Sequence, residues 1–250
     1  MRKILLGVIC ALTFLLPQVG WTQSARANLP PALQAAVQSG NTNAIAQAIS
    51  ALSGGNPQTA ANLANNVAAL AEQMVAVNPQ AAISAIQAAV AVVNAQPILS
   101  GAPQQALSVA VAASRIIVNP AVQQVTPQSV GALAVQLSQL AATPSVYQAS
   151  PSAAISIMAN AYAAVTNPAV SAAAPEAAQQ VATVLSTAST DPALAQTNPT
   201  TAAQINAILA GQEPQTVIDN NQLNNQQQQT VEPVSIPESN GGSGSSASPS

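Results

Sequence analysis

A dipeptide that ends in proline recurs along most of this 250-residue chain with a fixed period. Its evenly spaced copies are Asn78-Pro79, Ala102-Pro103, Thr126-Pro127, Ser150-Pro151, Ala174-Pro175 and Asn198-Pro199. An earlier copy, Asn56-Pro57, precedes the first of these by a slightly shorter interval. A fixed period of about 24 residues indicates a stack of small units that bury their apolar faces against one another, rather than one globular core.

The residues around the prolines predict two helices in each repeat. Proline suits the first helical position because its missing N–H would have no partner there, and Asn, Thr and Ser are residues that cap helix starts. About 15 helix-forming residues follow, and a second cap–proline pair then comes before a short helix, at the same offset in most repeats. In the repeat that starts at Asn78 the second proline, Pro97, is one position late, and we expect a slightly longer turn there. The other second pairs are Asn119-Pro120, Thr143-Pro144, Asn167-Pro168 and Asp191-Pro192.

The apolar residues agree with this interpretation. Val130, Leu133, Leu137 and Leu140 recur at steps of three and four residues, which is the spacing of one face of an α-helix. The sequence therefore predicts an all-α fold, an α-solenoid-like array of two-helix repeats of about 24 residues, each with one long and one short helix. The layout resembles small α-solenoids in architecture alone, because the signature residues of the tetratricopeptide, ankyrin and armadillo classes are absent.

Residues 1–27 have the layout of a secretory signal peptide. Arg2 and Lys3 form a short basic start, an apolar run reaches Leu16, and small residues precede Asn28, where we predict cleavage. An uncleaved membrane anchor is the alternative, but an apolar run of about 13 residues is too short to span a bilayer comfortably. We therefore expect an exported protein, periplasmic or extracellular, with no membrane span in the mature chain.

Composition divides the rest of the chain into three segments after the signal peptide. Residues 28–55 are interpreted as an N-terminal helical cap, and residues 56–212 as the repeat array. Residues 213–250 are rich in Gln, Asn, Ser and Gly. Such a composition buries too little apolar surface to order itself, so we expect a disordered tail.

The composition also argues against most kinds of chemistry. Without residues 1–27, Arg115 is the only basic side chain against seven acidic ones, a formal charge of −6, and the chain has neither His nor Cys. Nucleic-acid binding needs clustered Lys and Arg. A serine nucleophile needs a base beside it, and a metal site needs His, Cys or clustered carboxylates. We therefore expect no enzyme activity, no cofactor, no metal and no nucleic-acid partner.

The few charged residues of the repeats are interpreted as structural. Asp191 is the cap before Pro192, and Glu176 falls in a first helical turn, where negative charge is favourable. Arg115 lies near a helix C-terminus, which suits a cation. Gly131, a lone glycine inside a predicted helix, is interpreted as allowing close packing rather than the approach of a ligand.

Tyr147 and Tyr162 are the only aromatic residues after the signal peptide and the only candidates for interaction residues. One interpretation packs them at an interface between repeats. The other exposes them as part of a contact surface, because aromatic side chains are favoured at binding hot spots. The sequence leaves both interpretations open.

Two functions fit these observations. The first is a non-catalytic structural protein of the cell envelope or extracellular matrix, built on a helical-repeat rod that self-assembles. The alternative is an exported helical-repeat scaffold that binds a protein, peptide or glycan. The expected partner is accordingly either another copy of the chain or another envelope or extracellular protein.

Overall fold

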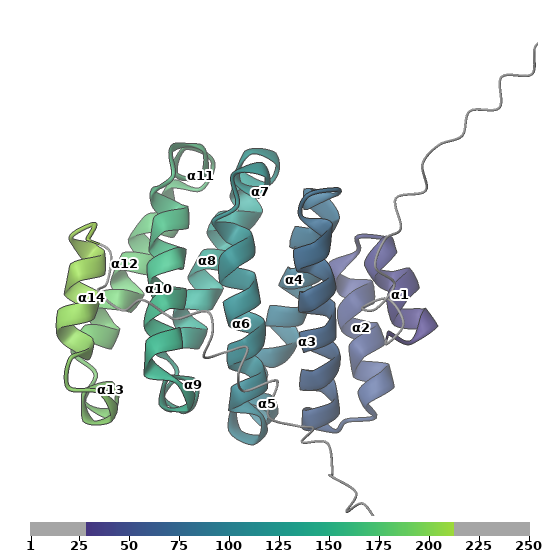
Figure 1. The fold of residues 1–250 in the computed structure, drawn as a ribbon, viewed down its shortest axis with the longest axis horizontal. Helices are drawn as coiled ribbons and strands as arrows, with labels where there is room; N and C mark the ends of the chain where they lie inside the picture. The colour runs from purple at the N-terminus through teal and green to yellow at the C-terminus, as the bar shows by residue number, and fades with distance from the viewer. Residues whose placement is uncertain (1–28, 213–250) are drawn as a thin grey trace, which may run out of the picture. The chain divides into compact units, whose positions relative to one another are not determined.

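The computed structural model describes residues 29–212, which form an all-helical unit without strands (Figure 1). The predicted array of alternating long and short helices with a period of about 24 residues is confirmed in this part of the chain. The predicted signal peptide (residues 1–27) and the predicted disordered tail (residues 213–250) lie outside the described residues. The helices are α1 (Pro31–Gln38), α2 (Thr42–Ser53), α3 (Pro57–Met74), α4 (Pro79–Val93), α5 (Gln96–Gly101), α6 (Pro103–Ile117), α7 (Pro120–Val125), α8 (Pro127–Ala142), α9 (Pro144–Ala149), α10 (Pro151–Thr166), α11 (Pro168–Ala173), α12 (Pro175–Ser189), α13 (Pro192–Thr197) and α14 (Thr201–Leu209).

The residue before each proline acts according to its type. Asn78 and Asp191 are N-caps, whose side-chain oxygens accept hydrogen bonds from backbone N–H groups at 3.0 and 2.8 Å. The same role was expected for Thr126, Thr143 and Ser150, and this expectation was wrong, because none of them makes a side-chain cap bond. The two threonines instead donate to the carbonyl oxygen four residues back, at 3.0 and 3.1 Å. A hydroxyl can donate to the carbonyls that end the preceding helix, whereas a carboxylate only accepts.

The late proline of the first regular repeat does not lengthen the turn, contrary to expectation. Helix α5 begins at Gln96, and its offset from Pro79 equals the offset of every later short helix from the start of its own repeat. Pro97 occupies the second position of α5. That position also lacks an intrahelical partner for its N–H, so it tolerates proline as the first position does. The position of the helix in the repeat is therefore kept, and the proline moves within it.

The long helices form two layers, and successive long helices alternate between them. One layer contains α3, α6, α10 and α14, and the other contains α2, α4, α8 and α12, with neighbours in each layer in contact (Figure 1). The short helices connect the two layers, alternately at one edge and at the other. A helix and its neighbour in the same layer are thus two repeats apart, as α4, α8 and α12 illustrate with their starts at Pro79, Pro127 and Pro175. Side-chain bonds between neighbours in a layer accordingly join residues 42 to 47 apart.

The core lies between the layers and follows the predicted stripe. Val130, Leu133, Leu137 and Leu140 are all fully buried. The short helices α7, α9, α11 and α13 each bury an aliphatic side chain at the same position, and these are Val122, Val146, Val170 and Leu194. Gly131 allows close packing, as the sequence suggested, because a Cβ atom placed on it would lie 2.7 Å from the Cβ of Ala174. The backbone of α8 therefore lies unusually close to the start of α12.

Candidate binding groove

An open groove on the surface of the unit lies between α8 and α12. Its volume is about 480 Å³, which is within the range of roughly 300–1,000 Å³ of small-molecule sites. Four of its six lining residues carry an amide or a carboxylate. The groove is lined by Gln139, Glu176, Gln179, Gln180, Thr183 and Val184.

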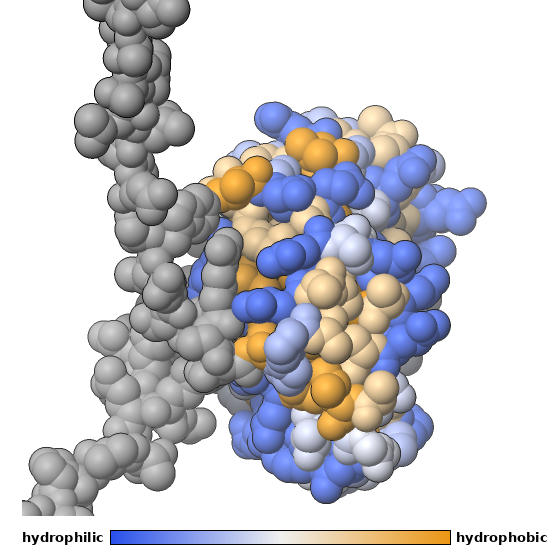
Figure 2. Space-filling model, turned by 90° about the vertical axis from the view of Figure 1, so that its right-hand side faces the viewer, coloured by the Kyte–Doolittle hydropathy of each residue, from blue (hydrophilic) through white to orange (hydrophobic). Residues whose placement is uncertain are grey.

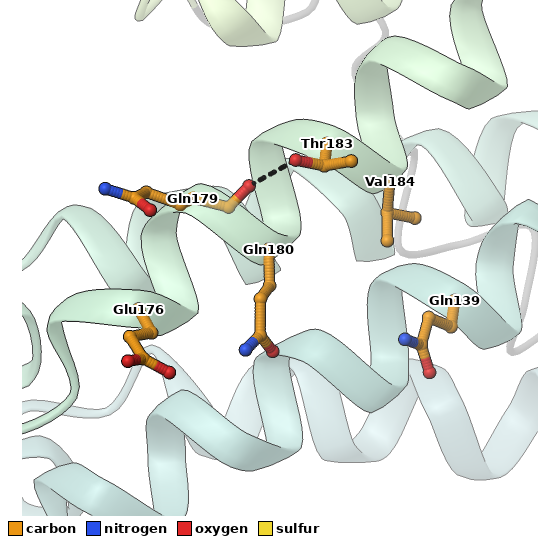
Figure 3. A pocket seen from close by; sticks show the side chains of 6 residues that line it. All are labelled: Gln139, Glu176, Gln179, Gln180, Thr183 and Val184. Carbon is orange, nitrogen blue, oxygen red and sulfur yellow. Dashed lines mark hydrogen bonds between the residues drawn. The ribbon is translucent and has the colours of Figure 1, made fainter.

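The two helices hold these side chains in different orientations (Figure 3). Glu176, Gln180 and Val184 extend from α12 toward α8, whereas Gln179 points away from α8. Gln139 is the contribution of α8. Glu176, Gln180 and Val184 lie on one side of α12 because they are spaced four residues apart, close to one turn of an α-helix. The groove therefore offers amide and carboxylate groups from one helix opposite an amide group from the other.

The groove lies where the repeat pattern changes from apolar to polar. The fifth residue of each regular repeat, counted from its proline, faces the next helix of the same layer, as the contact of Gly131 with the start of α12 shows. In α12 the fifth residue is Gln179, which is exposed, because no further helix of that layer follows among the described residues. The buried residues in this position of α4, α6, α8 and α10 are Ile83, Leu107, Gly131 and Ile155.

Glutamine is common along this whole layer, and the groove is one part of a wider amide surface. Each of α4, α8 and α12 presents glutamine side chains that are exposed or half-buried. We call these residues the glutamine face. They are Gln80, Gln87, Gln128, Gln136, Gln139, Gln179 and Gln180.

The groove carries one charge. Residues 29–212 contain three carboxylates, Glu72, Glu176 and Asp191. Asp191 caps α13, and the Oε1 of Glu72 lies 3.5 Å from Nη1 of Arg115, so these two have partners. Glu176 has no hydrogen-bond or ion-pair partner within the described part of the chain. It lies in the first turn of α12, where the helix dipole favours a negative charge.

The two tyrosines lie elsewhere and are packed between repeats. Tyr147 is fully buried, and its hydroxyl oxygen lies 2.5 Å from Oγ1 of Thr201. Tyr162 is half-buried, and its hydroxyl donates to the backbone oxygen of Leu209 at 3.4 Å. Both tyrosine hydroxyls thus form hydrogen bonds that connect α14 to the preceding repeats. The packed interpretation describes Tyr147, which offers no surface to a partner in this structure.

The chemistry available in the groove is hydrogen bonding. A glutamine amide both donates and accepts, and the carboxylate accepts or pairs with a cation. Sequence reasoning missed the groove residues because single exposed glutamines look like ordinary surface residues. The change at the fifth position, where the apolar or glycine residues of four repeats give way to Gln179, marks α12, but Gln179 itself points away from α8.

Within the described residues no group of three or more His, Cys, Asp or Glu side chains is placed to hold a metal ion. None of the described helices combines the length and the apolarity that crossing a membrane requires. Comparisons with protein-family models, with curated proteins and with solved structures found no match to this chain.

Proposed function

We propose that this chain is an exported, non-catalytic scaffold that binds an extended peptide segment of another envelope or extracellular protein. The observation that supports this most directly is the groove between α8 and α12, whose amide groups come from two packed helices. The packed helices fix the backbone positions from which these side chains extend, so binding orders side-chain rotamers but not the backbone.

The amide groups favour a peptide over a sugar. An extended peptide presents N–H and C=O groups in alternation, and Gln139 and Gln180 can each serve both. No aromatic ring lines the groove, and both tyrosines of the described unit pack against α14 instead. A sugar ring therefore finds no flat apolar face there.

The test is a titration of the full secreted chain, followed by NMR of the glutamine side-chain amides. The probe is a short peptide of alternating Thr and Ala, which is uncharged and favours extended backbone. We expect it to shift the signals of Gln139 and Gln180, and we expect Gln139→Ala or Gln180→Ala to weaken its affinity by roughly 2- to 10-fold, the loss of about one hydrogen bond. Gln148→Ala is the control, since this exposed glutamine lies on α9 outside the groove.

Two results would contradict the proposed peptide binding. If the peptide shifts neither signal at millimolar concentration, the proposal is wrong. If maltohexaose shifts them and the peptide does not, the groove binds glycans, and the partner class changes.

A second function, a self-assembling structural protein of the envelope or matrix, has one observation in its favour. The end of the unit at which α1 and α2 lie carries a band of apolar surface (Figure 2). Leu52, on α2, is 40% exposed, and Ala32, Ala35 and Ala51 are exposed at the same two helices. Sedimentation velocity of the full chain at rising concentration separates the two functions, because the structural role requires larger species and the scaffold role predicts a constant mass.

A further inference from the structure

We propose that the groove selects peptides that carry a basic side chain, which pairs with Glu176. This inference rests on the proposed peptide-binding function and names the ligand more closely. Glu176 and Gln180 extend from α12 toward α8 (Figure 3), so a peptide on the amide groups would lie beside the carboxylate.

Within its layer, the carboxylate of Glu176 is found only in α12, one of the two helices that line the groove. The second residue of the repeat is also exposed in α4 and α8, which belong to the same layer, and there it is glutamine, at Gln80 and Gln128. Among these three helices only α12 carries a charge at this position, at Glu176. The helix dipole favours a carboxylate at this position equally in all three helices, so it does not account for the presence of a charge in α12 alone.

No side chain among residues 29–212 pairs with the carboxylate of Glu176. Glu72 is paired with Arg115, and Asp191 caps α13, but Glu176 has neither kind of partner among residues 29–212. Arg115, the one basic residue in that range, lies on α6 in the other layer. The groove therefore presents an uncompensated negative charge, and a guanidinium or ammonium group supplies the complement, with a charge-assisted hydrogen bond.

The pairing has a matched test. Two Thr-Ala peptides are compared on the full secreted chain, one with a central arginine and one with citrulline, which has nearly the same shape but no charge. We expect the arginine peptide to bind roughly 3- to 10-fold tighter at low salt, within the range of charge-assisted bonds at a solvated site. Salt should reduce this difference, because it screens exposed charges.

Two variants of equal charge then locate the effect. Glu176→Gln should abolish the preference for arginine, so that the arginine and citrulline peptides bind with equal affinity. Glu72→Gln removes the same charge on α3, in the other layer, and should leave the preference intact. Agmatine, a free guanidinium compound, separates a peptide from a small cation, because we expect it to bind far more weakly than the arginine peptide.

Each contrary result has a distinct meaning. Equal affinity of the two peptides, or a preference that survives Glu176→Gln, overturns the pairing but leaves the scaffold function standing. Agmatine binding as tightly as the arginine peptide replaces the peptide with a small cation as the ligand. Failure of both peptides to bind overturns the proposed function, and this inference with it.

Discussion

Gln123 shows how one buried amide joins three parts of the array. This residue is only 6% exposed, and its Nε2 donates to the backbone oxygen of Ile117 at 2.9 Å. Its Oε1 accepts a hydrogen bond from Nδ2 of Asn167 at 2.9 Å, and Asn167 caps α11. The amide therefore connects the end of α6, the short helix α7 and a repeat 44 residues further on. A side chain that is both donor and acceptor is needed, which explains a buried polar residue in an apolar array.

We expect Gln123→Ala to destabilise the protein by about 1–3 kcal/mol, because it leaves the buried carbonyl of Ile117 and the half-buried side-chain amide of Asn167 without their partner. Urea denaturation followed by circular dichroism measures this change. Gln124→Ala is the matched control, since the neighbouring glutamine is exposed, and surface substitutions of this kind stay within about 0.5 kcal/mol. Equal effects of the two substitutions would show that the buried bonds contribute nothing to stability.

At the scale of helices, the contact between α8 and α12 depends on a missing side chain. A Cβ atom on Gly131 would lie 2.7 Å from the Cβ of Ala174 and 3.2 Å from that of Ala177. Neither alanine can rotate away, because a Cβ is fixed to the backbone. The two helices that form the groove are thus held close together at this point.

Gly131→Ala should therefore destabilise the protein although alanine favours helices. The gain in helix propensity is about 1 kcal/mol, and overpacking of a core costs roughly 1–3 kcal/mol, so we expect a net loss near 1 kcal/mol in urea denaturation. The double variant with Ala174→Gly should recover this loss by removing the clash. Gly101→Ala is the control, because its nearest contact would be 3.8 Å, to the side chain of Pro57. A stabilised Gly131→Ala protein would contradict the packing described here.

The sequence predicts single helices better than their arrangement. Helix starts are local, since proline and the residue before it decide them, and α8, α10 and α12 begin where expected. The alternation of layers depends on contacts between residues far apart in the chain, and every repeat has the same pattern whichever layer it joins. The threonine caps were wrongly predicted for a similar reason, because the choice between donating and accepting depends on the preceding helix. The groove could not be predicted from single residues, because its lining comes from two helices that are two repeats apart in the chain.

At the scale of the whole molecule, the C-terminal end of the described array is polar. Toward the C-terminal end, positions that are apolar or glycine in earlier repeats become polar and exposed, at Gln179 in α12 and at Asn206 in α14. The residues at the position of Asn206 in α4, α6, α8 and α10 are Ile86, Ala110, Ala134 and Met158, all buried, whereas Ala182 of α12 is half-buried. A repeat array needs a polar outer face on its last units, and Gln179 and Asn206 place polar side chains on the last two long helices among residues 29–212.

These two polar residues should keep this end from joining other copies. We expect the double variant Gln179→Ile, Asn206→Met, which restores the residues of the earlier repeats, to associate with itself, because it exposes an apolar surface of the kind that the array buries inside. Sedimentation velocity of the full chain should show a mass that rises with concentration more steeply than for the unaltered chain. Gln148→Ile adds one large apolar side chain to exposed α9, and a single scattered residue of this kind should have no such effect. If the double variant sediments like the unaltered chain, the polar end residues do not prevent association, and the array is terminated by other parts of the chain.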